Sequence, residues 1–246
     1  MSNLCWIAHE RYSENASVNL ICFSYVGGSA TYFAPLKPKI DSRINICPVL
    51  YPGREKNIGK KEFDTVREMA QAFVQENKYL FERRFALLGH CTGALIAYEV
   101  AIRAQELYNV SPEGFIASSS PAPSCKQFWP KNELPDDELT TYLLNNRMVD
   151  LDFTKNEIYT SYYLPLIRSD LQMFTRYTPS APYAKIKTSV NVLRGDSDML
   201  FDNPDAITEW KHFTDGSVTE DVFTGGHFYI DEHRGEVGEY ITKKLI

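Results

Sequence analysis

The chain has 246 residues, of which 43% are hydrophobic, and it carries a formal net charge of -6. This length and apolar content suffice for one large core, so we expect a single domain over residues 1–246. An acidic chain without a basic cluster is not expected to bind nucleic acid, and without an apolar run of roughly 18 residues it is not expected to span a membrane.

The N-terminus and the cysteines indicate the cellular compartment and bear on metal binding. Residues 1–10 lack a basic stretch followed by an apolar core, so no signal or transit peptide is predicted and we expect a cytoplasmic protein. Five cysteines, an odd number without C-x-x-C spacing, indicate neither a disulfide framework nor a zinc knot. His9 and Glu10 do not continue into the H-E-x-x-H zinc pattern. We therefore expect neither a metal nor a cofactor.

Short apolar runs alternate with segments of helical periodicity along most of the chain. Near-continuous hydrophobicity over four to seven residues is typical of strands buried on both faces of a parallel sheet. Apolar residues at helical spacing predict one helix within 63–74, and an Ala- and Leu-rich stretch predicts another over 93–107. Strand followed by helix, repeated, predicts an α/β fold with a mostly parallel central sheet and helices on both faces. The predicted strands are 20–24, 44–50, 85–88, 114–118, 190–193 and 218–223.

The segment 133–177 departs from this alternation. It contains two or three helical stretches in a row without a strand between them, and it is rich in aromatic and Met side chains such as Tyr142, Met148, Tyr159 and Met173. We expect a helical lid inserted over the carboxyl edge of the sheet. The alternative is an extra pair of core helices packed on one face of the sheet.

Residues 87–94, with the sequence LLGHCTGA, place the pattern G-x-C-x-G between a predicted buried strand and a predicted helix. This is the pattern of a nucleophile elbow with cysteine where serine usually stands. Small residues two before and two after the nucleophile let the chain form the strained turn that presents the side chain above the sheet. Cys91 is therefore the predicted nucleophile, and the alternative is an inert buried cysteine in a chance match.

Acidic and histidine side chains follow later strands in the order that a hydrolase triad requires. Asp196 and Asp198 lie in a turn after the fifth predicted strand, and His227 follows the last strand behind two glycines. A carboxylate in such a turn can accept a hydrogen bond from an imidazole and fix its tautomer. The chain order is nucleophile, acid, base, as in α/β-hydrolases. This role explains His227 better than a metal site shared with Asp231 and His233.

An oxyanion hole needs two backbone N–H donors aimed at the developing negative charge. Thr92, the residue after the predicted nucleophile, supplies the first by position. The second is expected in the loop 23–30, where a strand runs into a Gly-rich stretch; Val26 is the preferred donor and Tyr25 the next candidate. A phosphate cradle is the alternative for this loop, but neither G-x-G-x-x-G nor the P-loop pattern is met.

Taken together, these segments resemble the type II thioesterases of nonribosomal peptide and polyketide assembly lines. These are stand-alone α/β-hydrolases related to the thioesterase domain of fatty acid synthase, and the resemblance runs nearly end to end. The matching segments are 23–30, 50–55, 89–94, 164–170 ahead of Tyr177, 195–198 and 225–228.

The resemblance implies roles for particular residues and a partner. Cys91, Asp198 and His227 take the triad positions, and the segment 133–177 takes the position of the lid. The implied partner is an acyl or peptidyl carrier protein whose phosphopantetheine arm holds the acyl group. The chain departs from the family at the nucleophile, because the family ordinarily has serine followed by methionine where this chain has Cys91 and Thr92.

Several functions are compatible with these residues. The leading hypothesis is hydrolysis of acyl or aminoacyl thioesters through an acyl-Cys91 intermediate, by a monomeric enzyme. A second is acyl transfer or cyclisation, in which an amine or thiol replaces water, since an acyl-cysteine stays activated. A third is a non-catalytic carrier-protein binder with a decayed site. Hydrolysis of oxyesters or peptides is a further alternative, because fold alone does not fix the substrate.

Overall fold

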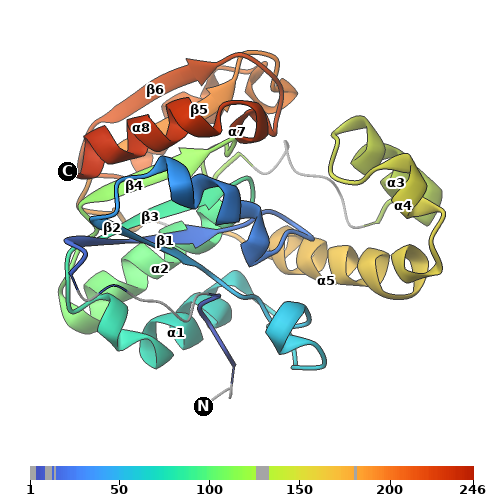
Figure 1. Cartoon of the computed structure of the whole chain (residues 1–246), viewed down its shortest axis with the longest axis horizontal. Coiled ribbons are helices and arrows are strands. Elements are labelled where there is room, and N and C mark those ends of the chain that lie inside the picture. Colours follow the sequence, from blue (N-terminus) through green and yellow to red (C-terminus); the bar gives the residue numbers. More distant parts are fainter. Residues whose placement is uncertain (1–3, 9–12, 14, 126–132, 180–181) are drawn as a thin grey trace.

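The computed structural model describes residues 4–8, 13, 15–125, 133–179 and 182–246. At its centre, six strands form one sheet in the order β2-β1-β3-β4-β5-β6, and each neighbouring pair is parallel, as Figure 1 shows. The mostly parallel central sheet predicted from the sequence is therefore confirmed. The strands are β1 (Val18–Phe23), β2 (Ile44–Pro48), β3 (Phe85–His90), β4 (Gly114–Ser118), β5 (Val190–Gly195) and β6 (Val218–Phe223).

Helices connect the strands, and local side chains set where the first of them begins. Phe63, which the sequence pattern includes in a helix, lies before α1, because Thr65 caps that helix by accepting the Glu68 N–H at 3.1 Å. Among the described residues, no helix combines the length and apolar character needed to cross a bilayer. The α-helices are α1 (Val66–Glu76), α2 (Gly93–Tyr108), α3 (Asp136–Asn145), α4 (Leu151–Thr154), α5 (Leu164–Thr175), α6 (Asp205–Thr208), α7 (Tyr229–Glu232) and α8 (Arg234–Leu245).

Shorter helical turns complete the connections. A π-helical turn, η5, runs directly into α5, and the remaining turns are 3-10 helices. The longest 3-10 helix, η1, follows the Gly-rich loop after β1 and contains two prolines, which favour this irregular helix over a regular one. The turns are η1 (Ala30–Lys39), η2 (Glu55–Asn57), η3 (Lys78–Leu80), η5 (Tyr159–Tyr163), η6 (Met199–Phe201) and η7 (Glu209–His212).

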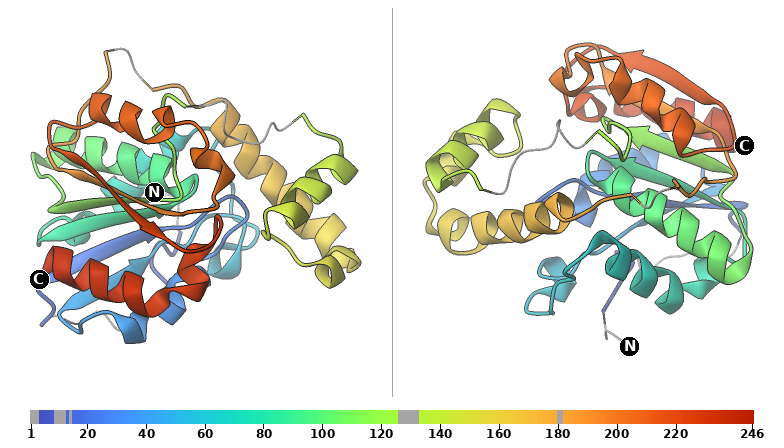
Figure 2. Two further views of the ribbon diagram at one scale, coloured as in Figure 1. Left: turned by 90° about the horizontal axis from the view of Figure 1, so that it is seen from above. Right: turned by 180° about the vertical axis from the view of Figure 1, so that it is seen from behind.

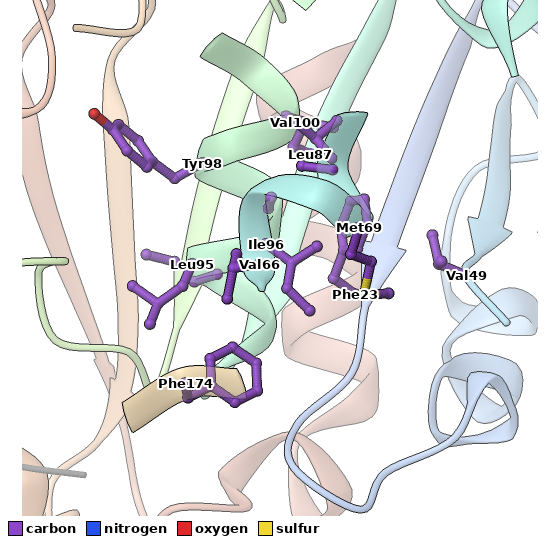
Figure 3. Packing of buried hydrophobic residues seen from close by; sticks show 14 of the residues in the cluster. Phe23, Val49, Val66, Met69, Leu87, Leu95, Ile96, Tyr98, Val100 and Phe174 are labelled. Carbon is purple, nitrogen blue, oxygen red and sulfur yellow. The ribbon is translucent and has the colours of Figure 1, made fainter. Parts of the chain in front are cut away.

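Helices cover both faces of the sheet, and successive strand residues face opposite sides. In β1, Ile21 and Phe23 belong to the core on the face of α1 and α2, whereas Leu20 and Cys22 belong to the core under η1 and α8. This period of two is the side-chain alternation of a strand. Figures 1 and 2 show the two helical layers, and Figure 3 shows Phe23 packed with Leu87 and residues of α1 and α2. The sheet is thus held between two apolar layers.

The last strand differs from the sequence expectation. The pattern predicts that all six strands are buried on both faces, but β6 is only partly buried, with Glu220 in its exposed part. β6 lies at one edge of the sheet and pairs only with β5. Because β2, at the other edge, is buried throughout, the edge position alone does not account for the exposure of β6. Glu220 forms an ion pair with Arg194 of the neighbouring strand at 2.6 Å. Charged residues on an edge strand discourage pairing with other chains.

The helices from α3 to α5 stand beyond the end of the sheet. α5 runs outward from the body, and α3 and α4 lie near its far end (Figures 1 and 2). The carboxyl-terminal part of α5 packs into the core through Phe174, whereas its middle meets the loop after β1, where Ile167 lies against Gly27. The segment 133–177 therefore reaches the carboxyl edge of the sheet, where catalytic groups of such sheets are found.

Candidate active site

Cys91 lies at the sharp turn between β3 and α2. Its φ angle is +56°, a left-handed conformation that a residue with a side chain rarely adopts. Its backbone N–H donates to the Ser118 carbonyl at the end of β4, at 2.8 Å. The side chain is 6% exposed. The turn therefore holds the sulfur at the carboxyl edge of the sheet, as the elbow pattern predicts.

The two glycines of the elbow are required by close approaches of the backbone. A Cβ on Gly89 would lie 2.2 Å from the Cα of Ala94, and a Cβ on Gly93 would lie 2.2 Å from the carbonyl oxygen of Phe23. Both distances are too short for a real contact. The small residues in the G-x-C-x-G pattern therefore allow β1, the turn and the start of α2 to pack directly on one another.

His227 is hydrogen-bonded to Asp198 and lines one cavity with Cys91. His227 Nδ1 lies 3.0 Å from Asp198 Oδ2, and the charge of Cys91 acts on the same imidazole. The second oxygen of Asp198 accepts the Leu200 N–H at 3.1 Å. The histidine and aspartate side chains are 10% and 2% exposed. A carboxylate in this position holds the imidazole in one orientation and tautomer.

Asp196, the other acid in the turn, does not contact His227. Its Oδ1 accepts the Gly225 N–H at 3.0 Å and the Ser197 hydroxyl at 2.9 Å, and these bonds lower the pKa of its carboxyl group. Asp196 thus ties the turn after β5 to the glycines that precede His227. The geometry supports Asp198, which the G-x-x-D spacing favours, as the orienting acid.

A pair of isosteric substitutions tests this choice. We expect Asp198→Asn to lower the rate of thioester hydrolysis roughly 10²-fold, because a neutral amide no longer stabilises the imidazolium. Asp196→Asn should change the rate less than about threefold, since an amide oxygen still accepts the Gly225 N–H. Initial rates of thiol release measure both. Equal losses in the two variants would contradict the assignment of Asp198.

The surroundings of His227 determine its charge. Burial by itself would lower the pKa of His227, but a thiolate on Cys91 and the Asp198 carboxylate outweigh burial and raise that pKa to about 10. At neutral pH this shift favours the protonated imidazole. Acylation of Cys91 would remove the thiolate charge, which is the largest raising influence. The imidazole would then lose its proton more easily and become a base.

This coupling predicts a change in titration on modification of Cys91. In the free enzyme, His227 should titrate with a pKa of about 10. Alkylating Cys91 with iodoacetamide and replacing Asp198 with asparagine should each move that pKa downwards, because each removes a negative charge beside the imidazole. NMR of ring-labelled histidine measures the two shifts. An unchanged His227 pKa after alkylation would mean that the sulfur and the imidazole are not coupled.

The two residues predicted to form the oxyanion hole, Thr92 and Val26, line one cavity with Cys91. Thr92 N is at the start of α2, and Val26 N is in the loop after β1. Within the described residues, neither N–H donates to a protein acceptor, and both residues are 1% exposed. Together with Cys91 and His227 they line one cavity. Buried donors without protein acceptors, in residues that line one cavity, suit the stabilisation of an oxyanion.

Residues from the segment 133–177 complete this cavity. The π-helical turn and α5 do not contribute; the contribution comes from α3 and the stretch that follows it. One of these side chains is aromatic, one is polar and one is apolar. Leu200, in the turn after Asp198, also lines the cavity. The lining residues beyond the elbow and His227 are Tyr142, Asn146, Met148 and Leu200.

Sequence reasoning missed a second hydrogen-bonded group behind the site. His90 Nδ1 lies 3.0 Å from Ser118 Oγ, which lies 2.8 Å from the Tyr229 hydroxyl. Ser119 Oγ donates to the carbonyl oxygen of His227 at 2.8 Å. These bonds join the elbow, β4 and the histidine loop. The run of serines 118–120 after a predicted strand was the available signal, because buried hydroxyls need partners.

The candidate metal ligands give no cluster in the part of the chain that the structure describes. There, no group of three or more His, Cys, Asp or Glu side chains is arranged to hold an ion. His9 and Glu10 lie outside the described residues. His233, at the start of α8, is hydrogen-bonded to Glu236 at 3.0 Å instead.

Comparison with known proteins identifies the family. Residues 18–245 match the thioesterase domain family. The chain is 29% identical over 246 residues to thioesterase PikA5 of Streptomyces venezuelae, covering 98% of this chain and 85% of that protein. It superimposes on the type II thioesterase BorB from the borrelidin biosynthetic cluster with a TM-score of 0.85 and 31% identity, covering 98% of each chain. For RedJ, a thioesterase of the prodiginine pathway in Streptomyces coelicolor, the TM-score is 0.84 and the identity 26%, covering 94% of this chain and 86% of RedJ.

The family match runs from the first residue of β1 to the last residue of α8, so it covers the whole sheet and both helical layers. The matches confirm that the architecture predicted from the sequence is that of an α/β-hydrolase. The chain therefore belongs to the thioesterase family and is an enzyme that hydrolyses thioester bonds.

Proposed function

We propose that this thioesterase releases acyl or aminoacyl groups from the phosphopantetheine arms of carrier proteins in nonribosomal peptide or polyketide biosynthesis, through an acyl-Cys91 intermediate. The observation that carries the mechanism is that Cys91 lines one cavity with His227, whose ring is hydrogen-bonded to Asp198. The pathway class rests on relatives such as BorB, whose name places it in the borrelidin biosynthetic cluster.

In the acylation half-reaction, the Cys91 thiolate attacks the carbonyl carbon of the bound thioester. The carbonyl oxygen becomes an oxyanion, which accepts hydrogen bonds from the N–H groups of Thr92 and Val26. When the intermediate collapses, the bond from the carbonyl carbon to the arm's sulfur breaks. The His227 imidazolium gives its proton to that departing sulfur, which leaves as a thiol.

In the deacylation half-reaction, His227 is neutral and takes a proton from a water molecule. The resulting hydroxide attacks the acyl-Cys91 carbonyl, and the same two N–H groups hold the oxyanion. Cys91 then leaves as a thiolate next to the imidazolium, which restores the starting site. Because the first step exchanges one thioester for another, it is nearly isoenergetic, and the intermediate remains reactive towards water.

We propose that the segment 133–177 acts as a lid and that residues 1–246 form one domain beneath it. Tyr142 and Met148 contribute to the wall of the cavity over Cys91, which favours apolar or aromatic acyl groups. A second, open cavity lies beside Asp198 and His227, between residues 145–147 and the histidine loop, and offers a path for a long flexible arm. Each proposed catalytic group belongs to one chain, so a monomer is sufficient for catalysis. We place this activity in the cytoplasm.

Acyl transfer or cyclisation is the second candidate, and the nucleophile itself favours it. An acyl-cysteine is more reactive towards amines and thiols than an acyl-serine, so an acceptor that enters the site can replace water. The covalent half-reaction is identical in both cases. Product mass separates the two, because hydrolysis gives the free acid, whereas transfer gives an amide, a lactam or a new thioester.

The test uses carrier protein loaded with short acyl or aminoacyl groups. The wild-type chain should release free acid, and Cys91→Ala should release it no faster than the uncatalysed reaction. Cys125→Ala is a control for the loss of a buried thiol outside the site, and its rate should match the wild type. No release above the Cys91→Ala rate across the panel would refute the proposal.

A further inference from the structure

A buried ion pair joins two segments that the catalytic mechanism does not use. Arg54 Nη2 lies 2.6 Å from Asp170 Oδ1, and the two residues are 4% and 8% exposed. Arg54 follows β2 by six residues, and Asp170 lies in the middle of α5. Both belong to segments, 50–55 and 164–170, that stand out in the sequence without an assigned role.

Each partner of the ion pair also binds the loop that carries Val26. Asp170 Oδ2 accepts the Gly27 N–H at 2.8 Å, and Arg54 Nη1 donates to the Gly28 carbonyl at 2.8 Å. The Gly27 N–H belongs to the peptide group directly after Val26. Holding that peptide plane restricts the ψ angle of Val26. This in turn restricts the direction in which the Val26 N–H points.

The loop conformation depends on these two bonds. Gly27 has a φ of +71°, and its Cα lies so close to α5 that a Cβ would meet Ile167 Cγ1 at 2.6 Å. At the other end of the loop, Glu55 Oε2 accepts the Ala30 N–H at 3.0 Å. The segment around Arg54 and the middle of α5 therefore hold the oxyanion loop from two sides.

Stability alone does not account for the pair. Burying two charges costs desolvation energy, and an apolar pair of the same size is often as stable or more stable. What an apolar pair cannot do is accept the Gly27 N–H and donate to the Gly28 carbonyl. The feature specific to Arg54 and Asp170 is therefore the orientation of the loop.

We propose that Arg54 and Asp170 are positioning residues that aim the Val26 N–H at the oxyanion and make its direction depend on the position of α5. This inference rests on the proposed role of Val26 in the oxyanion hole. Because Asp170 lies on α5, which also carries the rest of the segment 133–177, a shift of that helix away from the sheet withdraws the acceptor from Gly27. Acylation of Cys91 then requires α5 to lie close enough to the loop for Asp170 to accept the Gly27 N–H.

The test compares two reactions of Cys91 that differ in their need for an oxyanion hole. Alkylation by iodoacetamide needs the thiolate but forms no oxyanion, whereas acylation by S-butanoyl-N-acetylcysteamine forms one. In Arg54→Met/Asp170→Leu, acylation should fall roughly 10²-fold, comparable to the loss of one oxyanion donor. Alkylation should change less than about threefold, because Cys91 and His227 are untouched. The melting temperature should fall only modestly, because relief from burying two charges offsets the loss of partners for the Gly27 N–H and the Gly28 carbonyl.

A second variant keeps the test decisive if the double substitution unfolds the chain. Asp170→Asn preserves the size of the side chain but has only one accepting oxygen, so it cannot serve both Gly27 and Arg54. It should lower acylation roughly tenfold and leave alkylation unchanged, since one charged hydrogen bond is lost. The control variant is Arg84→Gln/Glu113→Gln. It removes an ion pair at the amino ends of β3 and β4, away from Cys91, and should leave both rates at wild-type values.

Two results would overturn the positioning role in a folded variant: acylation within threefold of the wild type, or equal losses in acylation and alkylation. A selective loss of acylation supports it. Failure of the proposed function itself would appear in the wild-type chain, as the absence of any butanoyl adduct on Cys91, and would overturn both proposals.

Discussion

Replacing His227 with glutamine should lower kcat for thioester hydrolysis by roughly 10⁴-fold or more, because triad members act as a unit. The glutamine amide can still donate to Asp198, but it neither protonates the departing thiol nor takes a proton from water. Acylation and deacylation therefore both fail. Burst kinetics should show no rapid acyl-enzyme phase, which separates this loss from slow product release.

His233→Gln is the matched control for this substitution. His233 lies only six residues further along the chain, but its ring is hydrogen-bonded to Glu236 and does not approach Cys91. Its replacement should leave kcat within about twofold of the wild type, as expected for a surface substitution. A comparable loss in both variants would show that the loop, rather than the His227 imidazole, is responsible.

Replacing Gly93 with alanine should strongly destabilise the fold. The new Cβ would lie 2.2 Å from the Phe23 carbonyl oxygen and 2.6 Å from that of Ser24, and both are backbone atoms that cannot rotate away. We expect the free energy of unfolding to fall by roughly 3 kcal/mol, at the upper end of overpacking costs. Any surviving folded protein should be inactive, because β1 must move and carries the oxyanion loop with it.

Gly235→Ala provides the control, since a Cβ at that position of α8 meets nothing within 4 Å. Alanine is the better helix former, so this variant should gain up to about 1 kcal/mol. Urea denaturation followed by circular dichroism measures both changes. Equal midpoints for Gly93→Ala and the wild type would contradict the contact between α2 and the end of β1.

Local patterns predicted the parts of the site that depend on local chemistry. The elbow is recognisable because the close approaches at Gly89 and Gly93 demand small residues at fixed spacing around Cys91. Five of the six strands are buried as expected, because a strand covered on both faces needs a near-continuous run of apolar residues, which is visible in the sequence. β6 does not meet that expectation, and its own residues carry the signal, because Thr219, Glu220 and Asp221 are polar.

Long-range pairing is what the sequence left open. The choice between Asp196 and Asp198 depends on which carboxylate the His227 ring reaches, and His227 lies 29 residues after Asp198 in the sequence. The pair of Arg54 and Asp170 spans 116 residues, and neither residue alone indicates a partner. Such contacts follow from how α5 and the loops pack, so they become visible only in three dimensions.

The account depends most on covalent acylation of Cys91, and one measurement tests it directly. Carrier protein bearing a butanoyl group is mixed with the enzyme, the reaction is quenched at successive times, and the intact enzyme is weighed by mass spectrometry. We predict a mass increase equal to the acyl group, mapped to the peptide that contains Cys91, which forms and decays at rates matching the release of free acid. Release of acid without an adduct, or an adduct mapped to another residue, would contradict the account.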